Sequence, residues 1–273
     1  MRIGIYWYSA TGNTLFLARA CRDFWVGEGH EVTAFDMLNR ENLAVPVPET
    51  FDRVVFAFPV MVFRVPEVAR RFVTALPVAG KPVEAYLMLT SGGMAAKTDS
   101  LFEKLLAEKN IRLLDAVEPL CPDSYIPFRK YFAWFEKKGL SDDAATEAAR
   151  RFAAAVVGKA PDAPRKPWGG PVRWFFDRLG SVAPYEGARQ LLGPRFLDER
   201  LCKGCGVCAG VCPTGAIHME GTIPKVKEAD CIGCVACFNN CPENAWRLKR
   251  FDKKYHYRKT GEKVWRGMQP VRL

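Results

Sequence analysis

Eight of the ten cysteines fall into two copies of one spacing. The first run reads C-x2-C-x2-C-x3-C-P from Cys202 to Pro213, and the second run repeats it from Cys231 to Pro242. Thiolates hold iron–sulfur clusters in proteins, and this spacing is typical of bacterial [4Fe–4S] sites. Three thiolates on one tight loop can wrap three iron corners of a cluster, while the fourth, just before a proline, points away. The runs therefore predict two [4Fe–4S] clusters.

The fourth cysteine of each such run binds the cluster of the other run. The expected ligand sets are Cys202, Cys205, Cys208 and Cys241 for one cluster, and Cys212, Cys231, Cys234 and Cys237 for the other. We expect Gly204, Gly206 and Gly233 to permit the tight loops and to let amide N–H groups approach the sulfurs. Zinc, which usually takes four ligands from two CxxC pairs, fits this array poorly. Cys21 is expected in the core, and Cys121 has no assigned role.

A loop rich in hydroxyl groups joins the first predicted strand to a helix. It reads Ser9-Ala10-Thr11-Gly12-Asn13-Thr14. Its hydroxyls and backbone N–H groups converge on a helix N-terminus, which favours an anion. The loop contains no Lys or Arg and matches neither GxxxxGK[ST] nor GxGxxG. A phosphate monoester therefore suits the loop better than ATP or NAD, although such a loop can also serve merely as a helix cap.

The elements that must position these residues alternate between strand and helix. Strands are expected at 2–8, 31–35, 53–58, 83–89 and 111–117, and helices at 14–25, 65–76, 95–108 and 141–157. Apolar runs in the strands indicate burial on both faces, which predicts a parallel sheet between helices. Open sheets of this kind bind ligands where their strands end. Two further loops follow strands at that edge, Pro59-Val60-Met61-Val62-Phe63 and Thr90-Ser91-Gly92-Gly93.

The length of 273 residues, with 49% apolar and 26% charged residues, predicts an ordinary domain plus a smaller one and excludes a wholly disordered chain. We expect an α/β domain at 1–160, a proline- and aromatic-rich connector at 161–195, a cluster domain at 196–250 and a basic tail at 251–273. No apolar run approaches the roughly 20 residues of a membrane span, and no signal peptide pattern is found. The sequence thus predicts a cytoplasmic protein with reduced or metal-bound cysteines.

The net charge of +10 comes mostly from residues 247–273, which hold ten basic and two acidic side chains. We expect no nucleic-acid partner, because this tail carries no nucleic-acid-binding motif. A solvated arm lying on an acidic protein surface is the favoured interpretation. The amphipathic piece at 172–179 could lie on a membrane surface, but packing across a domain interface is favoured.

The phosphate-type loop and the cysteine runs resemble those of two known families. Residues 1–160 resemble a flavodoxin domain, with Ser9-x-Thr11-Gly12-x-Thr14 as its phosphate loop, and residues 196–246 resemble a bacterial two-cluster ferredoxin. Together they are similar to the flavodoxin–ferredoxin fusion proteins of anaerobic bacteria and archaea. The resemblance implies a flavodoxin-like five-stranded parallel sheet, a small α+β ferredoxin domain, and FMN beside the clusters. It places the flavin ring between the loops at 59–63 and 90–93.

The loop after the third strand departs from the family pattern. Relatives typically read Pro-Val-Tyr-Gly-Gly-Arg-x-Pro, whereas this chain reads Pro59-Val60-Met61-Val62-Phe63-Arg64-Val65-Pro66. Because a β-branched Val62 resists positive φ, we expect the one-electron-reduced flavin to be less stabilised than in usual flavodoxins. The alternative is that these replacements weaken the binding of FMN itself. The ring could instead stack on Phe63 or on the aromatic group Tyr125, Phe128, Tyr131, Phe132 and Trp134, or that group could simply belong to a core or interface.

These features favour an electron-transfer protein that relays low-potential electrons between FMN, two [4Fe–4S] clusters and a redox partner protein. The cofactors would do the chemistry, and the protein would set distances and electrostatics. The alternative is an FMN-dependent oxidoreductase acting on a quinone or NAD(P)H, in which the clusters carry electrons to or from the FMN. Such an enzyme would need a positioned proton donor, and His30, His218 and His256 offer no obvious one. A third interpretation is an interaction module with structural clusters.

Overall fold

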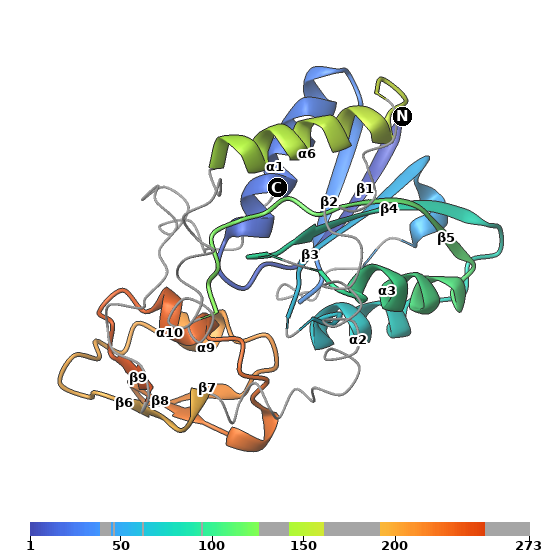
Figure 1. The fold of residues 1–273 in the computed structure, drawn as a ribbon. Helices are drawn as coiled ribbons and strands as arrows, with labels where there is room; N and C mark the ends of the chain where they lie inside the picture. The colour runs from blue at the N-terminus through green and yellow to red at the C-terminus, as the bar shows by residue number, and fades with distance from the viewer. Residues whose placement is uncertain are drawn as a thin grey trace.

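Five strands form one parallel sheet in the order β2-β1-β3-β4-β5 (Figure 1). The computed structural model describes residues 1–38, 45, 47–61, 63–93, 95–125, 142–160 and 192–248. The strands are β1 (Arg2–Trp7), β2 (Glu31–Asp36), β3 (Arg53–Pro59), β4 (Val83–Thr90) and β5 (Ile111–Val117). This order is that of the flavodoxin-like doubly wound fold, so the predicted fold class is confirmed.

Helices cover both faces of the sheet (Figure 1). The helices α1 (Asn13–Gly27) and α6 (Asp142–Val156) pack on one face, and α2 (Glu67–Ala75) and α3 (Thr98–Ala107) pack on the other. Side chains of β1 alternate between these two layers: Ile5 and Trp7 face α1 and α6, while Tyr6 faces the other core. Because both faces are apolar and covered, the strands read as continuous hydrophobic runs.

Local backbone chemistry sets where the helices begin. The predicted helix at 65–76 begins at Glu67, because Pro66 occupies the N-cap and disfavours a helical conformation at the residue before it. The predicted helix at 95–108 begins at Thr98, two residues after Ala96, whose φ of 49° is not helical. A short 3-10 turn, η1 (Pro48–Thr50), leads into β3.

The cysteine-rich part is a small α+β unit built from two similar halves. Strand β6 (Arg195–Leu197) pairs antiparallel with β9 (Trp246–Leu248), and β7 (Ile217–Glu220) pairs antiparallel with β8 (Ile223–Val226). Two short helices, α9 (Val207–Gly210) and α10 (Ala236–Asn240), each carry the third cysteine of a run, and η2 (Glu228–Asp230) precedes the second run. Residues 161–191 of the predicted connector, including the piece at 172–179, and residues 249–273 lie outside the described residues. None of the described helices has the length and apolar character to cross a membrane.

Candidate metal centres and phosphate loop

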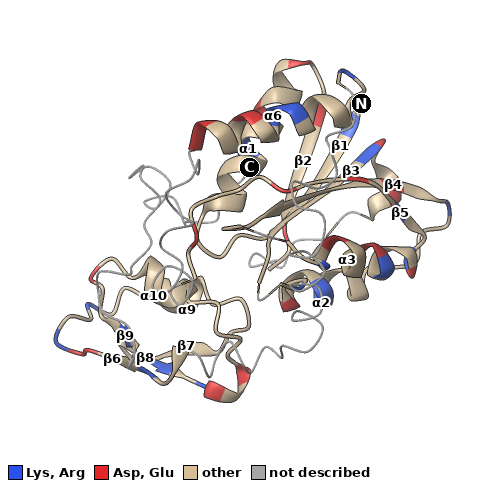
Figure 2. Cartoon of the chain, viewed as in Figure 1, with Lys and Arg blue, Asp and Glu red and all other residues tan. Residues whose placement is uncertain are grey.

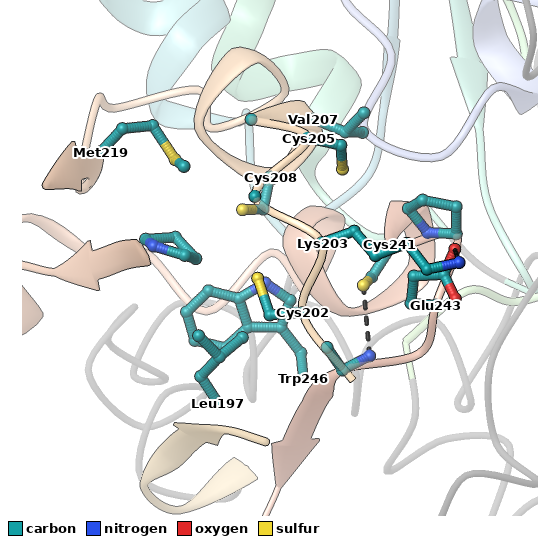
Figure 3. Close-up of a pocket in the computed structure, with 15 residues that line it drawn as sticks. Leu197, Cys202, Lys203, Cys205, Val207, Cys208, Met219, Cys241, Glu243 and Trp246 are labelled. Carbon is teal, nitrogen blue, oxygen red and sulfur yellow. Dashed lines mark hydrogen bonds and ion pairs between the residues drawn. The ribbon is translucent and has the colours of Figure 1, made fainter. Parts of the chain in front are cut away.

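The cysteine runs surround two separate cavities. The first cavity is lined by Cys202, Cys205, Cys208 and Cys241 (Figure 3), and the second by Cys212, Cys231, Cys234 and Cys237. Each cavity thus takes three cysteines from one run and its fourth from the other run.

Four left-handed residues shape the cysteine loops. Gly204 and Gly206 have φ of 67° and 72°, and Gly233 and Val235, 29 positions later, have φ of 70° and 53°. Gly204 is also needed for space, because a Cβ there would lie 2.8 Å from the Cβ of Thr222. Val235 occupies the N-cap of α10, where the first half has Gly206. The sequence pattern identified the three glycines but missed this strained valine, for which a left-handed backbone costs roughly 1–2 kcal/mol.

N–H groups approach the sulfurs in both cavities. The backbone N–H of Gly233 donates to Cys231 Sγ at 3.3 Å, and that of Ala245 donates to Cys241 Sγ at 3.2 Å (dashed in Figure 3). Such bonds withdraw electron density from thiolates and help set the reduction potential of an iron–sulfur cluster.

Desolvation makes three of these thiols poor acids before iron is bound. Burial raises the pKa of Cys208 and Cys237, and raises the pKa of Cys234 to about 12. At neutral pH these three thiols are therefore protonated in the metal-free chain, and metal binding must release their protons. The arrangement of soft sulfur donors around two cavities with N–H···S bonds fits [4Fe–4S] clusters.

A buried arginine and its carboxylate partner complete the second cavity. The Arg195 side chain is only 5% exposed, and its guanidinium donates to Cys231 Sγ and, at 2.7 Å, to Glu228 Oε2. Burial acts to lower the pKa of Arg195, but Cys231 and Glu228 outweigh this effect and raise it. Sequence reasoning missed both residues, since Arg195 precedes the first run by seven positions and carries no motif.

The loop at residues 9–14 leads into the N-terminus of α1. Gly12 takes a left-handed φ of 98° at the N-cap, and this helix end has no side-chain cap and no acidic residue in its first turn. Ser9 Oγ accepts the Gly12 N–H at 3.1 Å, and the Thr14 and Thr90 hydroxyls are 2.7 Å apart. The Ser9 O–H and one O–H of the Thr14–Thr90 pair are therefore left for a further acceptor. An uncapped positive helix end with such donors fits a phosphate group.

The other two predicted loops lie at the same edge of the sheet. Val60 donates its N–H to the Thr90 carbonyl at 2.8 Å, which ties the loop at 59–63 to the loop at 90–93. Met61 and Arg64 close a tight turn in which Phe63 has a φ of 60°. Phe63 thus has a left-handed backbone in this loop, and Val62, which we expected to resist a positive φ, lies outside the described residues.

The loop at 90–93 is held from within by polar contacts. Ser91 Oγ donates to Glu118 Oε1 at 2.6 Å and accepts the Gly93 N–H at 3.2 Å. Gly92 permits a close approach, because a Cβ there would lie 2.6 Å from the Asp123 side chain. The Asp123 side chain therefore fills the space that a side chain at position 92 would need.

The cysteine-rich unit packs directly on this edge. Helices α9 and α10 contain no charged residue (Figure 2), and Val211 and Ala236 join the hydrophobic core that includes Ala10. Val60, Met61, Val207 and Cys234 are partly buried against the same core. The amide of Asn240 donates to the Ala10 carbonyl at 3.2 Å, and that of Asn239 donates to the Ser124 carbonyl at 3.0 Å.

The remaining predicted residues have structural surroundings. Cys21 and Cys121 are both buried in the core between the sheet and the helices α1 and α6. Burial raises the pKa of Cys21 to about 12. Tyr125 packs against the core of the cysteine-rich unit, which agrees with the interface interpretation of that aromatic residue. Phe128, Tyr131, Phe132 and Trp134 lie outside the described residues.

Comparison with known proteins places the cysteine-rich part in a family. Residues 195–242 match the family described as a 4Fe-4S dicluster domain. A protein named "Probable ferredoxin" of Thermoplasma acidophilum is 47% identical over 32 residues, which are 12% of this chain and 46% of the relative. This chain therefore spans less than half of that curated relative.

The α/β part is similar to solved flavodoxin structures, at low identity. A flavodoxin of Streptococcus pneumonia TIGR4 is 13% identical, with a TM-score of 0.41, covering 59% of this chain and 100% of that one. A flavodoxin from the domain Archaea is 12% identical, with a TM-score of 0.44, covering 58% and 98%. An NAD(P)H:quinone oxidoreductase of Methanothermobacter marburgensis is 12% identical, with a TM-score of 0.39, covering 56% and 97%. Because these TM-scores are below 0.5, the flavodoxin-like assignment rests on the strand order.

Proposed function

We propose that this chain, a flavodoxin-like sheet joined to a 4Fe-4S dicluster region, is an electron carrier that passes electrons between FMN, two [4Fe–4S] clusters and a redox partner protein. One observation carries the proposal. Cys234 of the second cavity packs into the same core as Val60 and Met61 of a predicted flavin loop. A cluster ligand and a flavin loop in one packed core would bring the two redox groups close enough for electron exchange.

The cysteines would hold the clusters in the sets that the cavities bring together. Cys202, Cys205, Cys208 and Cys241 would bind the first cluster, and Cys212, Cys231, Cys234 and Cys237 the second. When bound, each cluster supplies a one-electron redox centre. The N–H groups of Gly233 and Ala245 would stabilise the thiolates at Cys231 and Cys241. Helices α9 and α10 would exclude water from the side that faces the sheet.

The loop at residues 9–14 would hold the FMN phosphate. The uncapped N-terminus of α1 and the hydroxyls of Ser9 and Thr14 would bind it without a basic side chain. The loops at 59–63 and 90–93 would flank the ring, and Met61 would stand where relatives have a stacking tyrosine. When bound, FMN supplies a centre that exchanges one or two electrons.

The exposed end of the relay would be the first cluster. Cys205 of the first cavity is exposed, although Cys208 and Cys241 of the same cavity are buried, and Cys234 of the second cavity packs on the sheet domain. Electrons would therefore pass between the flavin and the second cluster on the inside, and between the first cluster and the partner protein on the outside.

Anaerobic purification followed by iron, sulfide and flavin analysis tests this function. We expect about eight iron atoms, about eight sulfides and one FMN per chain. After addition of dithionite, the flavin and cluster absorbances should bleach together, and the chain should then reduce a redox protein such as a cytochrome.

Two outcomes would contradict the carrier function. If the chain retains both clusters but binds no FMN at micromolar concentration, it would be a ferredoxin whose sheet domain carries no flavin. Steady-state turnover with NAD(P)H or a quinone, faster than exchange with any redox protein, would favour the oxidoreductase alternative instead.

A further inference from the structure

The two cysteine cavities differ in one buried charge. Arg195 lines the second cavity, where its guanidinium donates to Cys231 Sγ from a side chain that is 5% exposed. The first cavity has only one lining cation among the residues described, Lys203, whose side chain is 72% exposed and paired with Glu243 at 3.1 Å. The backbone hydrogen bond described to a sulfur of the first cavity comes from a neutral donor, the Ala245 N–H.

The position of Arg195 is fixed by the strand that carries it. It is the first residue of β6 and lies opposite Leu248 of β9 in the antiparallel pair. Glu228 Oε2 accepts a second N–H of the Arg195 guanidinium at 2.7 Å and so orients this group. The Glu228 side chain is 51% exposed, so water screens its charge far more than it screens the buried guanidinium. A net positive field therefore remains at the Cys231 sulfur.

We infer that Arg195 makes the cluster held by Cys212, Cys231, Cys234 and Cys237 easier to reduce than the cluster of the first cavity. Reduction adds one electron to a [4Fe–4S]²⁺ core and gives [4Fe–4S]⁺, with no bond made or broken. A fixed cation in a low-dielectric site stabilises the more negative state, and a charge-assisted N–H···S bond does so more strongly than a neutral one. The inference rests on the ligand sets of the proposed function but not on the flavin.

This asymmetry gives the relay a direction. An electron that arrives at the first cluster, whose ligand candidate Cys205 is exposed, would move on to the second cluster, whose ligand candidate Cys234 packs on the sheet domain. Arg195 is then a positioning and tuning residue rather than a ligand, and its removal should change one potential without removing iron.

Redox titration of the intact, cluster-loaded chain, with dithionite as reductant and EPR detection, tests the inference. Arg195→Gln should lower the potential of one cluster by at least a tenfold change in its reduction equilibrium, which is 59 mV for one electron. Glu228→Gln removes the opposing carboxylate and should raise the same potential. Arg195→Lys keeps the charge and should lower the potential by less than half of the shift that Arg195→Gln causes.

Controls assign the effect to the second cluster. Lys203→Gln changes a cation beside the first cavity. It should shift the potential of the first cluster by less than half of the shift that Arg195→Gln causes in the second, since Lys203 is exposed and paired. In a Cys231→Ala background, where the second cluster is lost, Arg195→Gln should leave the remaining potential unchanged.

Equal shifts of both potentials, or no shift in either, would overturn the inference, as would an Arg195→Lys chain that behaves like Arg195→Gln. If Arg195→Gln fails to hold its clusters, the opposite shifts expected from Glu228→Gln and Arg195→Lys still decide the question. A parent chain without about eight iron atoms would instead refute the proposed function.

Discussion

At the scale of single residues, the second cysteine loop is built under more strain than the first. Val235 takes a left-handed φ of 53° at the position where the first loop has Gly206. Val235 is 2% exposed and packs in the core of the cysteine-rich unit, so its burial offsets the backbone cost. The two halves therefore share a backbone shape but reach it with different residues.

Replacing single cysteines tests which residues share a cluster. Cys241→Ala and Cys202→Ala should remove the same EPR signal, and Cys212→Ala and Cys231→Ala should remove the other, because each cavity is lined by cysteines of both runs. Iron should fall from about eight to about four atoms per chain in each variant.

Cys121→Ala is the matched control for the cysteine series. Its thiol is buried and lies 3.8 Å from the Pro119 carbonyl, away from both cavities, so its removal should leave the iron content unchanged. If Cys241→Ala and Cys231→Ala remove the same signal, the exchange of the fourth cysteine between the runs is wrong.

At the scale of elements, turns rather than helices place the reacting groups. Helix α1 contributes its N-terminus after the left-handed Gly12, and α10 contributes a buried end whose two asparagines reach the sheet domain. Short helices such as α9 and α10 are not stable alone, so their positions depend on the loops before them and on packing. The cysteine loops therefore control both cluster binding and the interface.

Two glycine substitutions in the first cysteine loop separate backbone strain from steric conflict. Gly206→Ala places a Cβ in open space and should cost about 1 kcal/mol, because φ is 72°. Gly204→Ala adds a contact of 2.9 Å with the Thr222 carbonyl at a similar φ, so it should cost more. Cluster loss to an iron chelator should be several-fold faster in Gly204→Ala than in Gly206→Ala. Equal rates would show that the close contact with Thr222 does not limit the loop.

At the scale of the whole molecule, the interface joins the phosphate-type loop to a cysteine helix. Asn240 precedes the ligand candidate Cys241 and donates to Ala10 within the loop at residues 9–14. A structural change at Cys241 can therefore affect the loop at residues 9–14, because the neighbouring Asn240 is hydrogen-bonded to Ala10. The apolar surroundings, with Ala10, Val211 and Ala236 in one core, make this bond costly to break.

Asn240→Ala tests this contact. It leaves the buried Ala10 carbonyl without its amide donor, which should destabilise the interface by about 1–3 kcal/mol. Amide hydrogen exchange within residues 9–14 should become faster. Asn239→Ala is the control, because its amide bonds to Ser124 instead, and exchange in residues 9–14 should stay near that of the parent. Unchanged exchange in Asn240→Ala would mean that the loop is held by the sheet domain alone.

The sequence alone determined the two cysteine runs, the hydroxyl-rich loop and the alternation of strands and helices. These are local features, because spacing along the chain fixes thiolate geometry within a loop and side-chain period within a strand. The confirmed five-stranded parallel sheet follows from this alternation, since apolar strands must be covered on both faces.

Only the tertiary structure decided how these parts meet. It brought Arg195 onto Cys231 across 36 positions and Asn240 onto Ala10 across 230 positions. It also showed a left-handed backbone at Phe63 in the loop after β3. Contacts of this kind depend on packing between separate elements, and neither periodicity nor motif spacing contains that information.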